Sequence, residues 1–226
     1  LLEEGMTGIE LCREIKRNIE TCHIPVVLLT ACTAIEYKLE GIQTGADDYI
    51  TKPFDINVLL ARCKNLVNNR IVLQEKFSKQ PQNNFQMIAT NPLDMKFVEQ
   101  AMQVIEKHIG DSDFSMNDFA REMCIARTKL FIKLKAITGQ TPNDLILTVR
   151  LHKAAVLLKN NPEYNIANIS TILGFSSPRY FSRCFKDKYG VTPQIYRRKD
   201  VSPNREQVEA GSEPSEAESA EMEDIS

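Results

Sequence analysis

The chain has 226 residues, of which 42% are hydrophobic and 26% charged, and its formal net charge is −2. This length predicts one or two domains, since a domain commonly takes roughly 100–200 residues, and the apolar content excludes a chain that is disordered throughout. No apolar run reaches the ~18 residues of a membrane helix and the first residues do not resemble a signal peptide, so a soluble chain is expected.

Residues 8–69 alternate between helix-like and strand-like patterns, which predicts an α/β region with a parallel sheet. The expected elements are a helical stripe at 11–15, a buried apolar strand at 24–29, a polar helical stretch at 37–42, a second strand at 49–53 and a helix at 58–66. Two strands are too few for a doubly wound core, so residues 1–69 are expected to form an incomplete α/β domain.

Two segments have compositions that are unsuited to a core. Residues 70–93 accumulate Gln, Asn, Lys and Ser, and this composition predicts a polar linker. Residues 199–226 are mainly Glu, Ser, Ala and Pro, and from 201 onward 1 basic and 8 acidic side chains give a net charge of −7. An acidic disordered tail is expected there, because the segment cannot bury enough apolar surface to order itself.

Residues 94–198 show helical periodicity throughout and contain one pattern twice. Short helices at 116–123 and 166–173 are each followed by a tight turn and a longer basic helix, which is the helix-turn-helix arrangement. The sequence therefore predicts an all-α domain with two such units. Residues 94–200 carry 17 basic and 11 acidic side chains, a net charge of +6, and this local excess indicates a nucleic-acid partner that the near-neutral total conceals.

The second basic helix begins with Ser177 as a capping residue and Pro178 at the first helical position. Its core face is formed by Phe181, Cys184 and Phe185. A solvated basic face is the alternative to a binding surface, but two tandem copies within a basic block favour DNA contact. The residues expected on the outer face are Arg179, Ser182, Arg183 and Lys186.

The first basic helix places Leu130, Leu134 and Ile137 toward the core. Its outer residues are expected to be Arg127, Thr128, Lys129, Ile132, Lys133 and Lys135. An outward Ile132 suits contact with a thymine methyl group, or else it weakens binding relative to a cation at that position.

Residues 94–198 resemble the AraC-type DNA-binding domain. The resemblance is carried by TKLF at 128–131, by Gly139 and Pro142, and above all by GFSSPRYFSRCFKDKYGVTPQIYRR at 174–198. It implies one domain whose two recognition helices enter successive major grooves. Ala126 departs from the pattern, because the family often has a capping Ser at that position.

Residues 1–69 resemble the C-terminal two-thirds of a response-regulator receiver domain, which implies an incomplete flavodoxin-like fold. The matching motifs are MTGIEL at 6–11, IPVVLLTA at 24–31 and GADDYITKPF at 45–54. By this resemblance Thr30 and Lys52 would contact a phosphoryl group and Tyr49 would be the switch aromatic. The family's phosphorylated Asp and metal-binding acidic pair would precede Leu1, so neither phosphoryl transfer nor a magnesium site is expected in this chain. An ordinary turn is the alternative for Lys52-Pro53.

The order receiver, linker, AraC-type domain resembles the C-terminal end of hybrid two-component regulators, which implies a histidine kinase partner, in the same longer chain or a separate one. The sequence thus predicts a sequence-specific DNA-binding transcription regulator acting on double-stranded operator DNA. The alternative is a module that docks a kinase without productive DNA binding. No nucleophile–base pair, metal ligand set or phosphate loop is visible, so neither an enzyme nor a cofactor site is expected. We expect a cytoplasmic location, with an inner-membrane anchor for a hybrid protein, and the resemblance allows a dimer through the receiver.

Overall fold

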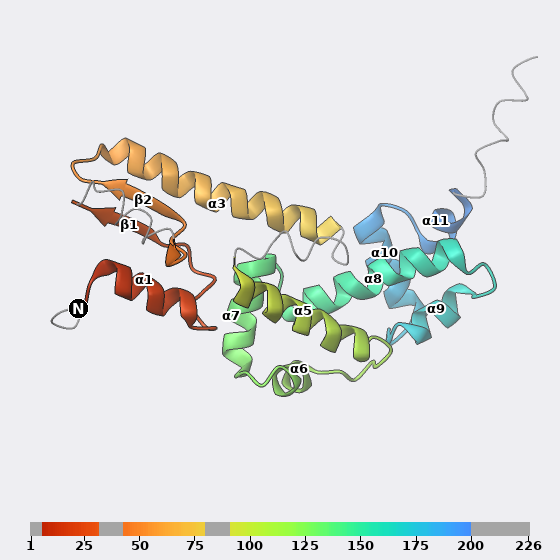
Figure 1. Cartoon of the computed structure of the whole chain (residues 1–226). Helices are drawn as coiled ribbons and strands as arrows, with labels where there is room; N and C mark the ends of the chain where they lie inside the picture. Colours follow the sequence, from red (N-terminus) through yellow and green to blue (C-terminus); the bar gives the residue numbers. More distant parts are fainter. Residues whose placement is uncertain (1–5, 32–42, 80–90, 200–226) are drawn as a thin grey trace, which may run out of the picture.

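The computed structural model describes residues 6–31, 43–79 and 91–199. A small α/β region and a larger helical region lie side by side, and the long helix α3 (Ile56–Lys79) runs from the first to the second (Figure 1). The fold class predicted from the sequence is confirmed. The helical stretch expected at 37–42 and the acidic tail from residue 200 onward lie outside the described residues.

The α/β region contains the predicted parallel pair of strands. Strand β1 (Val27–Thr30) pairs with β2 (Asp48–Thr51), in a register that sets Val27 beside Asp48 and Thr30 beside Thr51. Helix α1 (Gly8–Arg17) precedes them and begins with a capping box in which Thr7 and Glu10 satisfy each other's backbone N–H groups.

The two aspartates of the GADD turn hold this region together. Lys16 of α1 lies 2.6 Å from the Asp47 carboxylate, which also accepts a 2.8 Å hydrogen bond from the Val26 backbone N–H. Asp48 pairs with Arg62 of α3 at 2.7 Å. Both carboxylates are therefore engaged in ties between the sheet and the helices that flank it.

The linker expected from residue 70 onward is wrong over its first ten residues, because α3 continues to Lys79. The polar composition concealed an apolar contact: Phe77 is fully buried and belongs to the hydrophobic core of the helical region. One turn earlier, the Gln74 side-chain amide donates a 2.9 Å hydrogen bond to the Ala136 carbonyl. The end of α3 is thus part of the second domain's structure.

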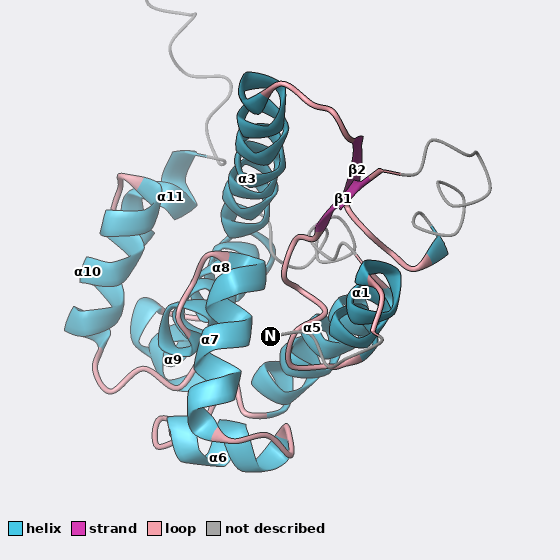
Figure 2. Cartoon of the chain, turned by 90° about the vertical axis from the view of Figure 1, so that its left-hand side faces the viewer, coloured by secondary structure: helices cyan, strands magenta, loops and turns pink. Residues whose placement is uncertain are grey.

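The helical region contains seven helices and no strand in the described residues (Figure 2). They form two groups of three around a long central helix (Figure 1). They are α5 (Pro92–Lys107), α6 (Met116–Glu122), α7 (Arg127–Thr138), α8 (Pro142–Asn160), α9 (Ile166–Ile172), α10 (Pro178–Tyr189) and α11 (Pro193–Lys199). Helix α8 begins as predicted, with Thr141 as its cap and Pro142 at its first position. Its first half contributes Leu145 and Val149 to one core and its second half Leu151 and Ala154 to another.

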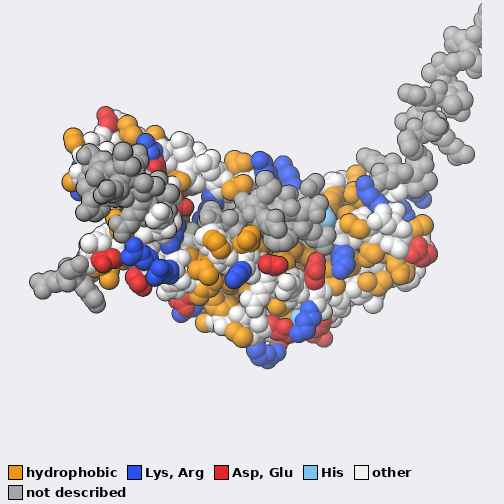
Figure 3. Space-filling view, viewed as in Figure 1, with side chains coloured by type: hydrophobic (Ala, Val, Ile, Leu, Met, Phe, Trp, Pro, Cys, Tyr) orange, Lys and Arg blue, Asp and Glu red, His pale blue; other side chains and the backbone are white. Residues whose placement is uncertain are grey.

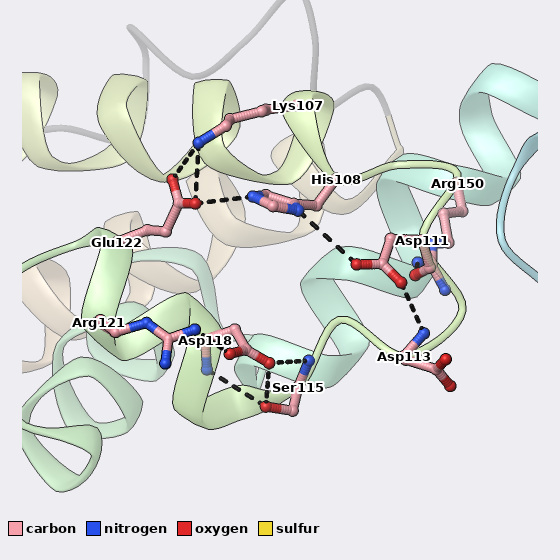
Figure 4. A network of polar contacts seen from close by, with 9 residues as sticks. All are labelled: Lys107, His108, Asp111, Asp113, Ser115, Asp118, Arg121, Glu122 and Arg150. Atoms are coloured by element: carbon pink, nitrogen blue, oxygen red, sulfur yellow. Dashed lines mark hydrogen bonds and ion pairs between the residues drawn. The ribbon is translucent and has the colours of Figure 1, made fainter.

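Polar contacts fix α6 against the end of α5 (Figure 4). The Glu122 carboxylate lies 2.9 Å from Lys107 Nζ and 2.9 Å from His108 Nε2. The Lys107 and His108 hydrogen bonds lower the pKa of Glu122, so the carboxylate is charged at neutral pH.

Arg150 of α8 connects the two helix-turn-helix units. Its guanidinium group donates hydrogen bonds to the carbonyls of Asp111 at 2.5 Å and Gly174 at 2.9 Å.

Each helix-turn-helix turn contains a residue in the left-handed region. Cys124 (φ 52°) occupies this position in the first unit and Gly174 (φ 66°) in the second. A side chain at Gly174 would collide with backbone at Ile109 and Gly110, about 2.9 Å from a Cβ atom, so the second turn requires glycine for space as well as for conformation.

No helix among the described residues is long and apolar enough to cross a membrane.

Replacing Phe77 with Ala tests whether α3 belongs to the second core. We expect the free energy of unfolding to fall by about 3–5 kcal/mol, because a fully buried aromatic ring leaves a cavity. The control is Ile71→Ala on the same helix, since Ile71 is 46% exposed, and this change is expected to stay within about 0.5 kcal/mol. Urea denaturation followed by circular dichroism measures both; equal stabilities would contradict the assignment of Phe77 to the core.

Candidate nucleic-acid interface

The second recognition helix, α10, is divided sharply into a buried and an exposed face. Its start is confirmed: Ser177 Oγ accepts a 3.2 Å hydrogen bond from the Tyr180 backbone N–H, and Pro178 follows the cap. Phe181 and Phe185 are fully buried and pack edge to face, with ring centroids 5.7 Å apart. This aromatic anchoring fixes which side chains α10 can present to a ligand.

The opposite face of α10 presents the predicted cations. Arg179, Arg183 and Lys186 are exposed and Ser182 is half-buried. A hollow of about 280 Å³ lies between Ser177, Arg179, Tyr180 and Arg183. The two arginines are four residues apart, so both reach the same side of the helix.

Tyr180 is a residue of this surface that sequence reasoning missed. Its ring is 40% exposed, and the Arg183 guanidinium carbon lies 5.4 Å from the ring centroid, within cation–π range. A hydrogen bond with the Cys184 side chain is the main cause that raises the pKa of the Tyr180 hydroxyl, which therefore stays neutral at physiological pH. The signal in the sequence was the spacing of three between an aromatic and an arginine on one helical face.

The first recognition helix, α7, has the predicted core face but a less regular outer face. Leu130, Leu134 and Ile137 are fully buried. Ala126 is the N-cap and makes no side-chain hydrogen bond, as its departure from the capping pattern predicted. Ile132 is 55% exposed and Phe131 39% exposed, so this helix presents apolar as well as basic groups. The predicted residues that are exposed are Arg127, Thr128, Lys129, Ile132 and Lys135.

The expectation that Lys133 lies on the outer face is wrong. The side chain is 1% exposed, and its Nζ lies 2.7 Å from Asp94 Oδ1 of α5 and 5.0 Å from the centroid of the Phe97 ring. Position 133 faces α5, and the buried carboxylate that neutralises it is 39 residues earlier in the chain. Helical spacing alone could not reveal this partner, because the pairing exists only after α5 packs on α7.

The three predicted receiver residues lie on or directly after the two strands: Thr30 ends β1, Tyr49 is the second residue of β2, and Lys52 follows β2. Thr30 and Tyr49 line one cavity of about 380 Å³ together with residues of β1 and the start of α1. The Lys52 backbone N–H donates a 2.6 Å hydrogen bond to the Thr30 carbonyl, while the Lys52 side chain is exposed. The fold therefore brings Thr30 close to both other positions.

Basic, acidic and apolar side chains are mixed on the face of the molecule seen in Figure 1, as the space-filling view shows (Figure 3). The positive charge of the helical region is therefore not spread over this whole face. The feature that points to a ligand is local: two helices, each anchored by a buried apolar face, present cations on the opposite side.

Comparison with known proteins agrees with this division of the chain. A family model for response regulator receiver domains matches residues 2–64, and one for helix-turn-helix domains matches residues 119–199. The chain joins a response-regulator receiver domain to an AraC-type helix-turn-helix domain. Neither of these two domain families is enzymatic.

Individual relatives match parts of the chain. The chain is 42% identical over 192 residues to histidine kinase P4 of Formosa agariphila, covering 85% of this chain and 14% of that protein. It is 50% identical over 60 residues to the phosphate regulon regulatory protein PhoB of Pseudomonas aeruginosa, 26% of each chain. The solved C-terminal domain of the response regulator AraT from Geobacillus stearothermophilus is 33% identical over 46% of this chain and 84% of that one, with a TM-score of 0.43. The chain spans only part of the curated relatives that it matches, 14% in the first case.

Replacing Lys133 with Ala is expected to destabilise the fold. Because the change leaves the buried Asp94 carboxylate without its counter-ion, the free energy of unfolding should fall by about 3–5 kcal/mol. The matched control is Lys135→Ala, an exposed lysine of the same helix, which should change stability by less than about 0.5 kcal/mol. Urea denaturation measures both, and an unchanged midpoint for Lys133→Ala would refute the buried pair.

Proposed function

We propose that this chain is the DNA-binding output of a two-component transcription regulator, and that α7 and α10 enter successive major grooves of an operator. The observation that carries this proposal is the exposed basic face of α10, set by the buried rings of Phe181 and Phe185 on its other side. A major groove admits one helix, whose exposed side chains then meet base edges and phosphates.

The side chains divide by chemistry. Arg179 and Arg183 are assigned to base edges, because a guanidinium forks onto guanine, and Tyr180 would hold Arg183 in position. Ile132 is assigned to a thymine methyl group. The phosphate contacts would come from Arg127, Thr128, Lys129, Lys135, Ser182 and Lys186.

The receiver region would supply the regulatory input. Thr30, Tyr49 and Lys52 are assigned the switch roles of a receiver, in which a hydroxyl and an ammonium group meet a phospho-aspartate. By the receiver resemblance, the phosphorylated aspartate and the acidic residues that would hold a magnesium ion belong at positions that precede Leu1 in the family pattern. The similarity to 14% of a histidine kinase supports a kinase partner within a longer chain, for which a membrane anchor is part of the proposal. A receiver-mediated dimer would fit paired half-sites.

Salt dependence of DNA binding tests the proposal. We expect log K for a duplex to fall with log salt with a slope near −4, as for about four or five neutralised phosphates. Fluorescence anisotropy over a salt series measures the slope, and Lys186→Ala should reduce its magnitude by about 1. A flat dependence would remove the DNA assignment and leave a module that docks a kinase.

Substitution of Arg179 or Arg183 by Ala tests base contact. On an operator selected from random duplexes, each change should weaken binding by about 1–3 kcal/mol and relax preference at one position. The matched control is Lys135→Ala, which should weaken selected and scrambled duplexes equally. If the arginine variants lose the same small amount on both duplexes, neither arginine contacts a base and α10 only grips the backbone.

A further inference from the structure

The connection between α1 and β1 lies against the first recognition helix. Residues 18–23, the first part of this connection, are called the α1–β1 segment below. Its Glu20 carboxylate forms an ion pair with Lys129 Nζ of α7. Figure 1 shows the end of α1 beside α7. A cavity of about 370 Å³ is lined jointly by Ile19 and Glu20 of the segment and by Ala126 and Lys129 at the start of α7.

Further contacts fix the α1–β1 segment in this place. The Cys22 carbonyl accepts a 2.9 Å hydrogen bond from the Asn91 side chain, and the Cys22 thiol lies 3.3 Å from the Asp94 carboxylate and 3.2 Å from Lys133 Nζ. Burial, with the neighbouring Asp94 charge, raises the pKa of the Cys22 thiol, so the thiol keeps the proton that it donates to Asp94. Arg70 of α3 donates to the His23 carbonyl at 2.6 Å.

The position of this contact along α7 matters for DNA binding. Base contacts of a helix-turn-helix unit come from the N-terminal residues of the recognition helix, and Lys129 is the third residue of α7. The Glu20 carboxylate contacts the Lys129 ammonium group, which is the group that would bind a DNA phosphate. A phosphate group and the Glu20 carboxylate are both negatively charged and repel each other when both lie next to the Lys129 ammonium group. The two groups therefore compete for that ammonium group.

We infer that the α1–β1 segment is an interaction surface for the first recognition helix and competes with the DNA backbone for Lys129. This inference rests on the proposed function. The competition is reversible, because Glu20 and Lys129 side chains remain 41% and 52% exposed and such pairs are weak. Arg179 and Arg183 of α10 are exposed, so the competition concerns the first unit and leaves the second available to DNA.

Carbodiimide cross-linking of the full 226-residue chain tests the contact directly. The reagent joins a carboxylate and an amine that touch, forming an amide with loss of one oxygen to the urea by-product. Mass spectrometry of the free chain should detect a Glu20–Lys129 link. A random-sequence DNA duplex at saturating concentration should reduce that link at least about fivefold if the ammonium group turns to phosphate. The internal control is the Lys107–Glu122 pair, 2.9 Å apart, whose link should not change.

A variant on the receiver side measures the effect on affinity. Glu20→Gln should raise affinity for the duplex about twofold to fivefold at low salt, the range that an exposed ion pair supplies. Glu14→Gln is the matched control, because it removes the same charge from an exposed position of α1 and should change affinity much less.

The outcomes separate the inference from the proposed function. If the chain does not bind the duplex, the proposed function fails and the competition fails with it. If the duplex binds while the Glu20–Lys129 link persists undiminished, or if no such link forms in the free chain, the competition alone is wrong. A Glu20→Gln gain no larger than that of Glu14→Gln would also overturn it.

Discussion

Phe77 fills the core of the first helix-turn-helix unit, and the helix that carries it begins beside the receiver sheet. Together with the hydrogen bond from Gln74 to the Ala136 carbonyl, this aromatic contact makes α3 an element of both regions. Because a helix is stiff over 24 residues, the sheet at its start is held at a definite place relative to the helices at its end. The position of the α1–β1 segment beside α7 depends on that constraint, and so does the geometry through which a receiver could influence DNA binding.

Within the helical region the two recognition helices are linked through α8. Leu145 and Val149 enter the first core, and Leu151 and Ala154 the second, so one rigid helix sets the distance between α7 and α10. Arg150, at the midpoint, donates to backbone carbonyls on both sides. Because α8 holds α7 and α10 at a fixed distance, the two helices fit only major grooves that are separated by that distance. This geometry contributes to specificity in addition to the individual base contacts.

The recognition helices divide their cations unequally. On α10 the cations predicted from the sequence are exposed, whereas on α7 Lys133 is buried against Asp94 and the exposed Lys129 pairs with Glu20. The number of basic residues in the sequence of the first unit therefore overstates the number of cations that α7 offers to DNA. With Ile132 and Phe131 also exposed, α7 offers a more apolar surface than α10, and the two units are not equivalent.

The sequence by itself determined the elements whose cause is local. The parallel strands, the caps at Thr141 and Ser177, the uncapped start at Ala126 and the core faces of both recognition helices follow from periodicity and capping chemistry over a few residues. Only the tertiary structure decided the continuation of α3 through a polar segment to Phe77, the burial of Lys133, and the pairing of Glu20 with Lys129. Each of these depends on groups far apart in the chain. Burial and ion pairing are set by which surfaces meet, and a local pattern carries no information about that.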